Sequence, residues 1–216
     1  MMKKYILSIA ILIFLIPSLA QAQRTRQASC ANQESSHWYL MPYGGVGAAW
    51  YSYNLNGTVV DSKLNSYETE ESNTMLTYDV GLMFLYHFDA INLGIGLEWQ
   101  GFNGSSSNGF TSRDVSLYYY KVYGRIEVPI FSDSFNDFGA YANIGAILPN
   151  NAEGDDVKIG YLIDLGLYYN LIINKSSSFY FGLGYQQASF SSTIGQAVSK
   201  HRQSDLKLTL GYRIWF

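Results

Sequence analysis

Apolar and polar residues alternate over the last twelve positions of the chain, 205–216. One phase of this segment is entirely apolar and consists of Leu206, Leu208, Leu210, Tyr212, Ile214 and Phe216. The other phase is mostly polar and includes Asp205, Lys207, Thr209 and Arg213. Because successive side chains of a β-strand point to opposite faces, the segment predicts a strand with one apolar and one mostly polar face.

Similar alternation recurs in seven earlier segments. They cover residues 38–51, 76–88, 91–100, 115–128, 138–148, 159–172 and 179–187. The clearest hairpin joins 76–88 to 91–100 through Asp89 and Ala90. Pro42 lies inside the first segment, and because proline cannot donate to a strand ladder, we expect a β-bulge there.

The connections between these segments alternate between long and short. The long set is 52–74, 101–113, 149–157 and 188–204, and the short set is 89–90, 129–137 and 173–178. Tilted strands with a rise of roughly 3.3 Å per residue cross an apolar band of roughly 25 Å within such lengths. The pattern predicts an all-β fold, an eight-stranded antiparallel up-and-down transmembrane β-barrel, with long loops outside the cell and both termini in the periplasm.

Aromatic residues gather near both ends of the expected strands. Trp50, Trp99, Tyr118, Tyr161 and Tyr185 fall at the outer interface. Trp38, Tyr86, Phe88, Phe138, Phe179 and Phe216 fall at the inner one. Amphipathic rings favour both membrane interfaces, so these positions predict two aromatic girdles.

The start of the chain predicts export. Lys3 and Lys4 precede the apolar run 5–16, and Ala20-Gln21-Ala22 has the form of a cleavage site. We therefore predict a signal peptide at 1–22, an N-terminal periplasmic segment at 23–37 and a barrel at 38–216. A retained membrane helix is the weaker interpretation, because polar residues begin at Gln21.

Composition narrows the class further. Aromatic residues make up 16% of the chain and charged residues only 14%, which suits a barrel better than a helical soluble protein. Removing Lys3 and Lys4 from the 14 basic residues leaves 12 against 17 acidic ones, a charge of −5 that does not suggest a nucleic-acid partner. Cys30 is the single cysteine, so an intrachain disulfide is excluded. Lipidation of Cys30 is less favoured than a free thiol, because Gln27 stands where an aliphatic residue is expected.

Charged residues of the strands fall in the phase opposite the apolar one. They are Asp79, Glu98, Lys121, Arg125, Glu127, Asp164, Lys207 and Arg213, four acids and four bases. Strand positions predict one layer with Arg125, Glu127 and Arg213 and a higher layer with the other five. An eight-stranded barrel is just wide enough for side chains, so we expect an ion-pair network that plugs the lumen. A gated ion or proton path through the same charges is the alternative.

Few residues suggest catalysis, a metal site or a cofactor. An enzyme that modifies lipid A needs a nucleophile beside a base at the outer leaflet, and His201 and Ser204 are the candidates. No acid is placed to orient His201, so polar loop residues are the simpler interpretation and no enzymatic activity is predicted. Three scattered histidines predict no metal site, and no cofactor is expected.

Two acidic clusters fall in the expected outer loops. They are Glu68, Glu70 and Glu71 in the first, and Glu153, Asp155 and Asp156 in the second. Such carboxylates suit divalent cations that bridge phosphates of lipopolysaccharide. Solvated loops are the simpler interpretation.

The closing segment resembles the last strand of bacterial outer-membrane β-barrels, in which a terminal Phe after alternating apolar residues is read by the assembly machinery. The resemblance assigns Tyr212, Ile214 and Phe216 to this assembly signal. The stretch 123–130, YGRIEVPI, also resembles the "YLEIP" strand of outer-membrane barrels of Bacteroidota. The mature chain is similar to the small OmpA-type and OmpX-type barrels. Unlike full OmpA proteins, it is expected to have no room for a C-terminal peptidoglycan-binding domain.

This resemblance implies a place in the outer membrane of a Gram-negative cell envelope. The expected partners are outer-membrane lipids, lipopolysaccharide, the barrel assembly machinery and an unknown extracellular or envelope protein. The first functional hypothesis is a structural or surface-interaction barrel that presents loops outward. The alternatives are a narrow, porin-like channel for ions or small solutes and, third, a lipid A-modifying enzyme.

Overall fold

Eight long β-strands account for nearly all of the chain that the computed structural model describes, residues 38–56, 71–88, 90–107, 112–150, 156–174, 176–194 and 197–216. The strands are β1 (Trp38–Asn56), β2 (Glu71–Phe88), β3 (Ile91–Ser107), β4 (Ser112–Ser132), β5 (Asn136–Pro149), β6 (Asp156–Asn174), β7 (Ser177–Ile194) and β8 (Ala197–Trp215). The predicted signal peptide, the segment 23–37 with Cys30 and His37, and most of the acidic clusters lie outside the described residues.

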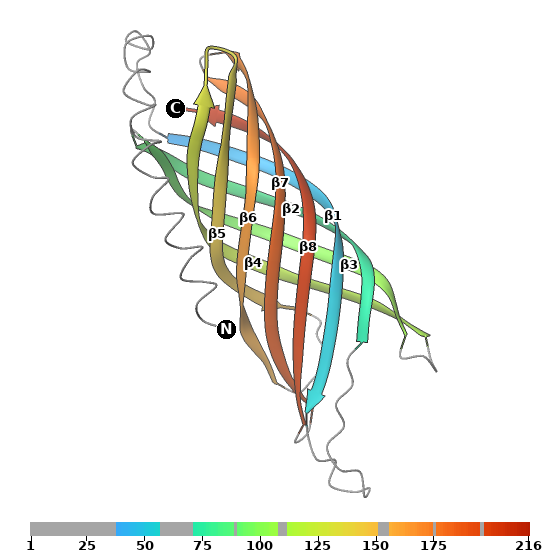
Figure 1. Cartoon of the computed structure of the whole chain (residues 1–216). Coiled ribbons are helices and arrows are strands. Elements are labelled where there is room, and N and C mark those ends of the chain that lie inside the picture. Colours follow the sequence, from blue (N-terminus) through green and yellow to red (C-terminus); the bar gives the residue numbers. More distant parts are fainter. Residues whose placement is uncertain are drawn as a thin grey trace, which may run out of the picture.

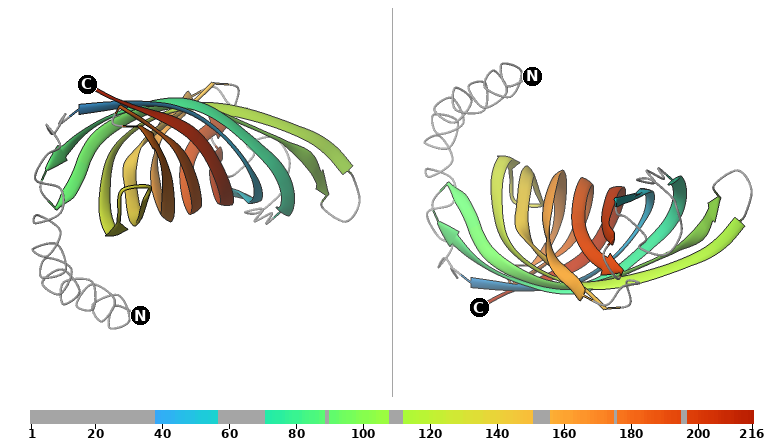
Figure 2. Two further views of the ribbon diagram at one scale, coloured as in Figure 1. Left: turned by 90° about the horizontal axis from the view of Figure 1, so that it is seen from above. Right: turned by 90° about the horizontal axis from the view of Figure 1, so that it is seen from below.

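The strands form one closed antiparallel sheet. Each strand pairs with its neighbours along the chain, and β8 pairs with β1 to close the barrel. Figure 1 shows β5 to β8 crossing in front of β2 to β4, and Figure 2 shows the curvature of the same sheet from above and below. The predicted eight-stranded up-and-down barrel is therefore confirmed.

The chain enters and leaves the barrel at one end, called here the inner end; the opposite end is the outer end. The backbone N–H of Phe216 donates to the carbonyl oxygen of Trp38 at 3.0 Å, and Figure 1 shows the C-terminus beside the start of β1. Connections at the inner end are short, with residues 89–90, 133–135 and 175–176 between strands. The predicted turns 129–137 and 173–178 are shorter than expected because the strands continue into them.

One of these turns is closed by an aspartate. Asp133 Oδ1 accepts the backbone N–H groups of Phe135 and Asn136, each at 2.7 Å. The hydrogen bond from Phe135 stabilises the carboxylate and holds the pKa of Asp133 below its ordinary value.

The exterior of the barrel is apolar and its interior is polar and aromatic. On β8 the side chains of Leu206, Leu208 and Leu210 are 48–61% exposed, whereas Asp205 and Lys207 are buried. This inverts the usual arrangement of a water-soluble domain, in which charged residues are almost never fully buried unless they are paired. Between the two ends of the barrel, the alternating sequence thus places its apolar phase outward.

Pro42 does not cause the predicted bulge. The register of β1 against β2 runs unbroken through the pair Pro42 and Leu82. Against β8, the register is the same on both sides of Pro42, and only the pairings of Met41 and Pro42 are missing. A missing N–H therefore costs local pairing with one neighbour without shifting the strand. The register shifts that do occur lie on other strand pairs, one near Pro129 and two along β6.

The strands extend further at the outer end than the sequence pattern suggested. The predicted loop 188–204 is almost entirely strand, since β7 ends at Ile194 and β8 begins at Ala197. The predicted loops 52–74, 101–113 and 149–157 are shortened in the same way. In these extensions the inward phase keeps apolar side chains such as Phe102 and Phe190, while the outward phase becomes polar. The sequence pattern therefore predicted loops there, because it identified strands by apolar residues on the outward face and these strand ends carry polar residues on that face.

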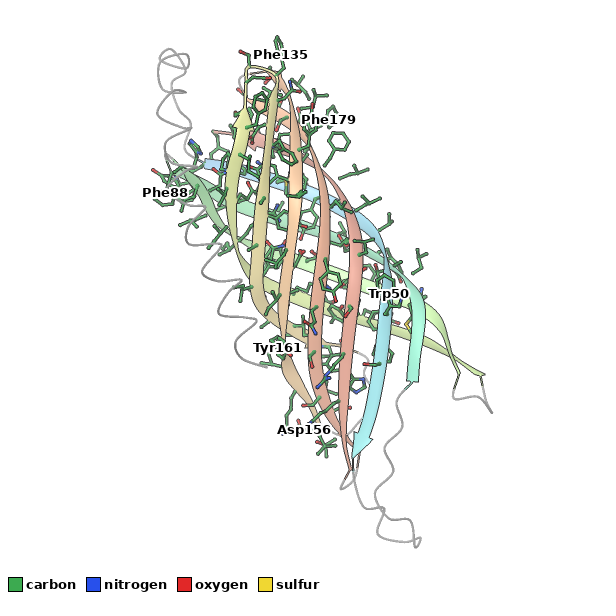
Figure 3. The ribbon with its side chains drawn as sticks, in the orientation of Figure 1. Trp50, Phe88, Phe135, Asp156, Tyr161 and Phe179 are labelled. Atoms are coloured by element: carbon green, nitrogen blue, oxygen red, sulfur yellow. The ribbon has the colours of Figure 1, made fainter. Side chains whose placement is uncertain are left out.

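Rings mark both ends of the apolar exterior. Figure 3 shows Trp50 and Tyr161 toward the outer end, and Phe88, Phe135 and Phe179 toward the inner end. Near the inner end, Trp38 stacks on Phe84 with 4.8 Å between ring centroids. Near the outer end, Trp99 lies 5.5 Å from Tyr78 and 6.2 Å from Tyr118. Among the described residues, no helix is long and apolar enough to cross a membrane.

Candidate functional site

The barrel interior is filled by two charged networks, each built around one glutamate. The first, called the lysine network, surrounds Glu98 on β3. Glu98 pairs with Lys121 of β4 and with Lys207 of β8, the latter at 3.1 Å. Tyr43 donates its hydroxyl to Glu98 at 2.8 Å, and Lys207 reaches Asp79 at 3.4 Å. Two acids and two bases are therefore in contact with one another and buried.

Amide side chains extend this network toward the outer end. Lys121 donates to Gln186 at 2.6 Å, and Gln186 donates to Gln100 at 3.1 Å. Gln100 in turn donates to Asp205 at 2.7 Å, and Thr77 donates to the same carboxylate at 3.0 Å. The polar groups are thus linked from strand to strand across the lumen.

Asp205 was missed as a lumen residue by the sequence analysis. It is completely buried and has the same phase on β8 as Lys207 and Arg213. That shared phase is the signal by which it could have been found. With Asp205 included, the buried acidic and basic side chains of the described lumen are five acids and four bases, one acid more than the predicted four of each.

The second network, called the arginine network, surrounds Glu127 on β4. Arg125 pairs with Glu127 at 2.7 Å, and Arg213 pairs with it at 2.6 Å. Tyr39 and Asn92 each donate to the other carboxylate oxygen at 3.0 Å. Each oxygen of this fully buried carboxylate therefore accepts two hydrogen bonds. A buried charge requires such partners to offset its loss of hydration.

Tyrosine rings enclose the two arginines. The guanidinium of Arg125 lies 3.8 Å from the ring centroid of Tyr141. That of Arg213 lies 4.8 Å from Tyr180, 4.9 Å from Tyr39 and 5.2 Å from Tyr168. A cation over an aromatic face is attracted by the ring quadrupole, and the attraction is greater where water is excluded. The arginine network is thus closed by rings.

Asp164 lies between the two networks. Its Oδ2 accepts from Asn143 at 2.7 Å, and Asn143 Oδ1 accepts from Arg125 at 3.3 Å. Asp164 forms no ion pair with the predicted higher layer, so the structure does not reproduce that five-residue layer as a single ion-paired group. A cavity of about 10 Å³ lies beside it, lined also by Lys207 and Tyr123. This is about the volume of one water-sized sphere, so the described lumen is a packed interior here.

Tyrosine rings also fill the lumen by lying against glycines. A Cβ built at Gly96 would collide with the ring of Tyr123, and one at Gly81 would collide with the ring of Tyr43. These two glycines face inward on β3 and β2, where their missing side chains leave room for the rings. Each ring therefore fills the gap left by the glycine that pairs with it on the adjacent strand.

The two residues considered for catalysis, His201 and Ser204, lie on opposite faces of β8. His201 is buried inside the outer end of the barrel, whereas Ser204 has the outward phase of β8. His201 instead contacts Ser192, with 3.1 Å between Nε2 and Oγ, and its Nδ1 is bonded to the Tyr51 hydroxyl. The ring of Phe190 stacks on it at 4.3 Å. Because both Ser192 and His201 are buried, this cluster is packed as part of the core.

Other histidine and acidic groups supply no metal centre among the described residues. His87 Nδ1 lies 2.7 Å from Asn92 Oδ1 near the inner end, which extends the arginine network. Such a contact fits a structural role for this histidine.

The three residues of the predicted assembly signal lie on the exterior of β8 near the inner end. Tyr212 meets Phe179 edge-on at 5.5 Å. Phe216 lies 6.1 Å from Phe84, beside the stacked pair of Phe84 and Trp38. Ile214 is 40% exposed in the same outward phase. In the closed barrel these side chains belong to the inner rim of the wall.

Comparisons with solved structures show the fold. OprG, an outer-membrane protein from Pseudomonas aeruginosa, is similar over 85% of this chain and 98% of its own, with 14% identity and a TM-score of 0.52. The outer-membrane protein AlkL is similar over 84% of this chain and 91% of its own, with 15% identity and a TM-score of 0.46. Neisserial surface protein A is similar over 81% of this chain and 97% of its own, with 11% identity and a TM-score of 0.42. The resemblance to outer-membrane barrels is therefore confirmed at the level of the fold.

No protein-family model and no curated protein sequence matches the chain.

Proposed function

We propose that this chain is an integral outer-membrane barrel whose lumen is plugged by side chains, with a structural or surface-interaction role. The observation that carries the proposal is the inverted distribution of polarity. Between the two aromatic girdles, no described charged side chain faces outward, whereas the lumen buries acids and bases together. Such a wall fits a hydrocarbon environment and leaves the outer strand ends for contacts.

The orientation that fits best places the inner end, with both ends of the barrel segment, in the periplasm. Short connections at the inner end and long strand extensions at the outer end support this choice. In this orientation the exterior residues Tyr212, Ile214 and Phe216 enter the barrel assembly machinery as part of the last strand. The outer end is then the part of the barrel that we assign to contact with an unknown extracellular or envelope protein.

A narrow channel is the second candidate. It is less favoured because buried ion pairs and rings occupy the described lumen, and the cavity between the two networks is water-sized. Reconstituted wild-type protein is expected to give no stepwise conductance in planar bilayers. Reproducible channel openings recorded with the purified wild type would contradict the plugged barrel and support the channel.

Lipid A modification is disfavoured by the separation of its two candidate residues. His201 is buried and Ser204 has the outward phase, so the nucleophile and base are not in contact. We infer a non-enzymatic barrel. Mass spectrometry of lipid A from cells that produce the protein is expected to show no new acylation pattern.

The membrane wall is tested by placing one charge on it. Leu165→Arg and Leu210→Arg introduce a cation at two exposed positions near the middle of β6 and β8. Each is expected to destabilise the inserted barrel by about 2–4 kcal/mol, the typical loss for a cation at the bilayer midplane. Urea unfolding in lipid vesicles and heat-dependent gel migration measure the loss.

Asn103→Arg is the matched control, because Asn103 is exposed toward the outer end of β3. There the same charge is expected to cost about 0–1 kcal/mol. Normal stability of both leucine variants would show that the exterior does not face lipid, and the proposal would be abandoned.

A further inference from the structure

We propose that the outer exterior of β6, β7 and β8 binds the phosphorylated headgroup of an outer-leaflet glycolipid. The surface, called the outer basic face, consists of Lys158, Lys200 and Arg202 with the hydroxyls of Ser189 and Ser191. This inference rests on the proposed membrane orientation and names a partner for one part of the outer end.

The strand register brings these residues together. Lys158 on β6 is the pairing partner of Ser191 on β7, and Ser191 is the partner of Lys200 on β8. Arg202 follows two residues after Lys200 and is the partner of Ser189. With strands about 4.8 Å apart and about 3.4 Å per residue, the backbones of the three cations fall within roughly 12 Å of one another.

A β-bulge directs Lys158 outward. The register of β6 against β7 shifts between Lys158 and Tyr161. Beyond the shift, Val157 packs against the core and Lys158 is exposed, although Lys158 has the same sequence parity as buried Leu162. Bulges commonly re-aim a side chain in this way. Without the extra residue the lysine would point into the lumen.

The cations begin where the apolar wall ends. Across β6, β7 and β8 the row Leu165, Tyr185 and Leu206 is followed toward the outer end by Ile163, Gln187 and Ser204. The next row is Tyr161, Ser189 and Arg202, and the last is Lys158, Ser191 and Lys200. Figure 3 labels Asp156 and Tyr161, which bracket Lys158 along β6. The face therefore lies at headgroup depth when the apolar rows face hydrocarbon.

The ion pairs found among the described residues do not include the three cations of this face. Of the cations whose side chains the structure describes, four are buried in the lumen and the other three form the outer basic face. Each ion pair found among the described residues lies in the lumen. The exterior of β6 to β8 carries one described acid near the face, exposed Asp156 at the start of β6. The net charge of the face is thus positive.

This chemistry fits phosphate esters on a sugar headgroup. An arginine fork binds two oxygens of one phosphate, and lysines add point charges that can reach a second phosphate. Serine hydroxyls donate to phosphate or sugar oxygens. Cations at a membrane surface attract anionic lipids by about fivefold in affinity for each lysine or arginine.

The test measures lipid retention by the full-length barrel in detergent. Native mass spectrometry compares binding of diphosphoryl lipid A with binding of its dephosphorylated form. Wild type is expected to prefer the diphosphoryl form, and the triple variant Lys158→Gln, Lys200→Gln and Arg202→Gln is expected to bind it about a hundredfold more weakly. The charge-keeping variant Lys158→Arg is expected to retain wild-type binding.

A control variant and two competitors show whether the retained lipid binds at the outer basic face through its phosphorylated sugar headgroup. Asn103→Ala removes a polar group toward the outer end of β3, away from the outer basic face, and is expected to leave binding unchanged. Phosphatidylglycerol and millimolar inorganic phosphate are expected to compete poorly. Equal binding of phosphatidylglycerol, or an unchanged triple variant, would overturn the inference.

Failure of the lipid-binding inference can be told apart from failure of the proposed membrane barrel. The triple variant is expected to insert into vesicles and to keep its heat-dependent gel migration, since its changes lie beyond the apolar wall. Normal insertion with no preference for phosphate rejects the outer basic face alone. Failure of the wild type to insert rejects the membrane barrel itself.

Discussion

The lysine network and the arginine network bury a glutamate in similar ways. Each glutamate lies between two cations and accepts a tyrosine hydroxyl, Tyr43 for Glu98 and Tyr39 for Glu127. Their surroundings differ. Lys207 in the first has a second acid, Asp79, within 3.4 Å, and the network continues into amide side chains.

The arginine network has no such second acid among its ion pairs. Both Arg125 and Arg213 are paired with Glu127 alone in the described lumen. Their remaining contacts are chiefly tyrosine rings and neutral polar groups. One network therefore has alternative partners for its charges and the other depends on a single carboxylate. This difference predicts unequal responses to loss of the central acid.

Removal of the glutamates should give the largest effect. Glu127→Ala leaves two buried guanidinium groups without an acid and is expected to destabilise the barrel by about 3–5 kcal/mol. Glu98→Ala should cost less, because Lys207 keeps Asp79. Urea unfolding in lipid vesicles measures both. Equal losses would show that the second acid does not compensate.

Removal of one lysine should give an intermediate effect. A fully broken buried ion pair costs about 3–5 kcal/mol, and Lys121→Met removes one partner of such a pair. In the structure Glu98 keeps Lys207, so the expected loss falls to about 1.5–3 kcal/mol, the range for a charge-assisted hydrogen bond. Bilayer recordings should stay silent, because methionine refills the space. Unchanged stability together with new conductance would contradict a packed network.

Removal of one hydroxyl should give the smallest effect. Tyr39→Phe and Tyr43→Phe each delete a hydrogen bond to a glutamate while keeping the ring. We expect a loss of about 1.5 kcal/mol for Tyr39→Phe, near the lower limit for bonds to charged groups. Tyr43 also bonds to the Tyr123 hydroxyl, so its variant is expected to be the less stable of the two. The same unfolding assay would detect the reverse order.

Much of the fold was predictable because lipid and lumen impose opposite preferences on alternate residues. All eight strands and the short link at 89–90 follow from that alternation. The outer extensions were missed because the outward phase turns polar where the apolar wall ends. The effect of Pro42 was also misjudged, since loss of one donor interrupted pairing with β8 and left the register intact.

The candidate site was predictable in composition more than in connectivity. Strand phase was enough to identify the eight charged lumen residues, but the partner of each depended on the register between strands. Thus Asp164 bonds to Asn143, a neutral residue that a search for charges passes over. Asp205 was overlooked although its phase matched that of Lys207. Sequence alone also gave no indication that a bulge would turn Lys158 outward.

The interlocking of tyrosine rings with inward glycines explains a feature of the whole composition. The chain contains 19 tyrosines and 20 glycines, and a methyl group at Gly81 or Gly96 would require a ring to move. The tyrosine and the glycine of each pair lie on different strands, so a substitution of the glycine displaces the ring of a residue that is distant in the sequence. Relatives of this protein should therefore exchange such tyrosine–glycine partners together, and a widened bore would begin with the loss of a ring.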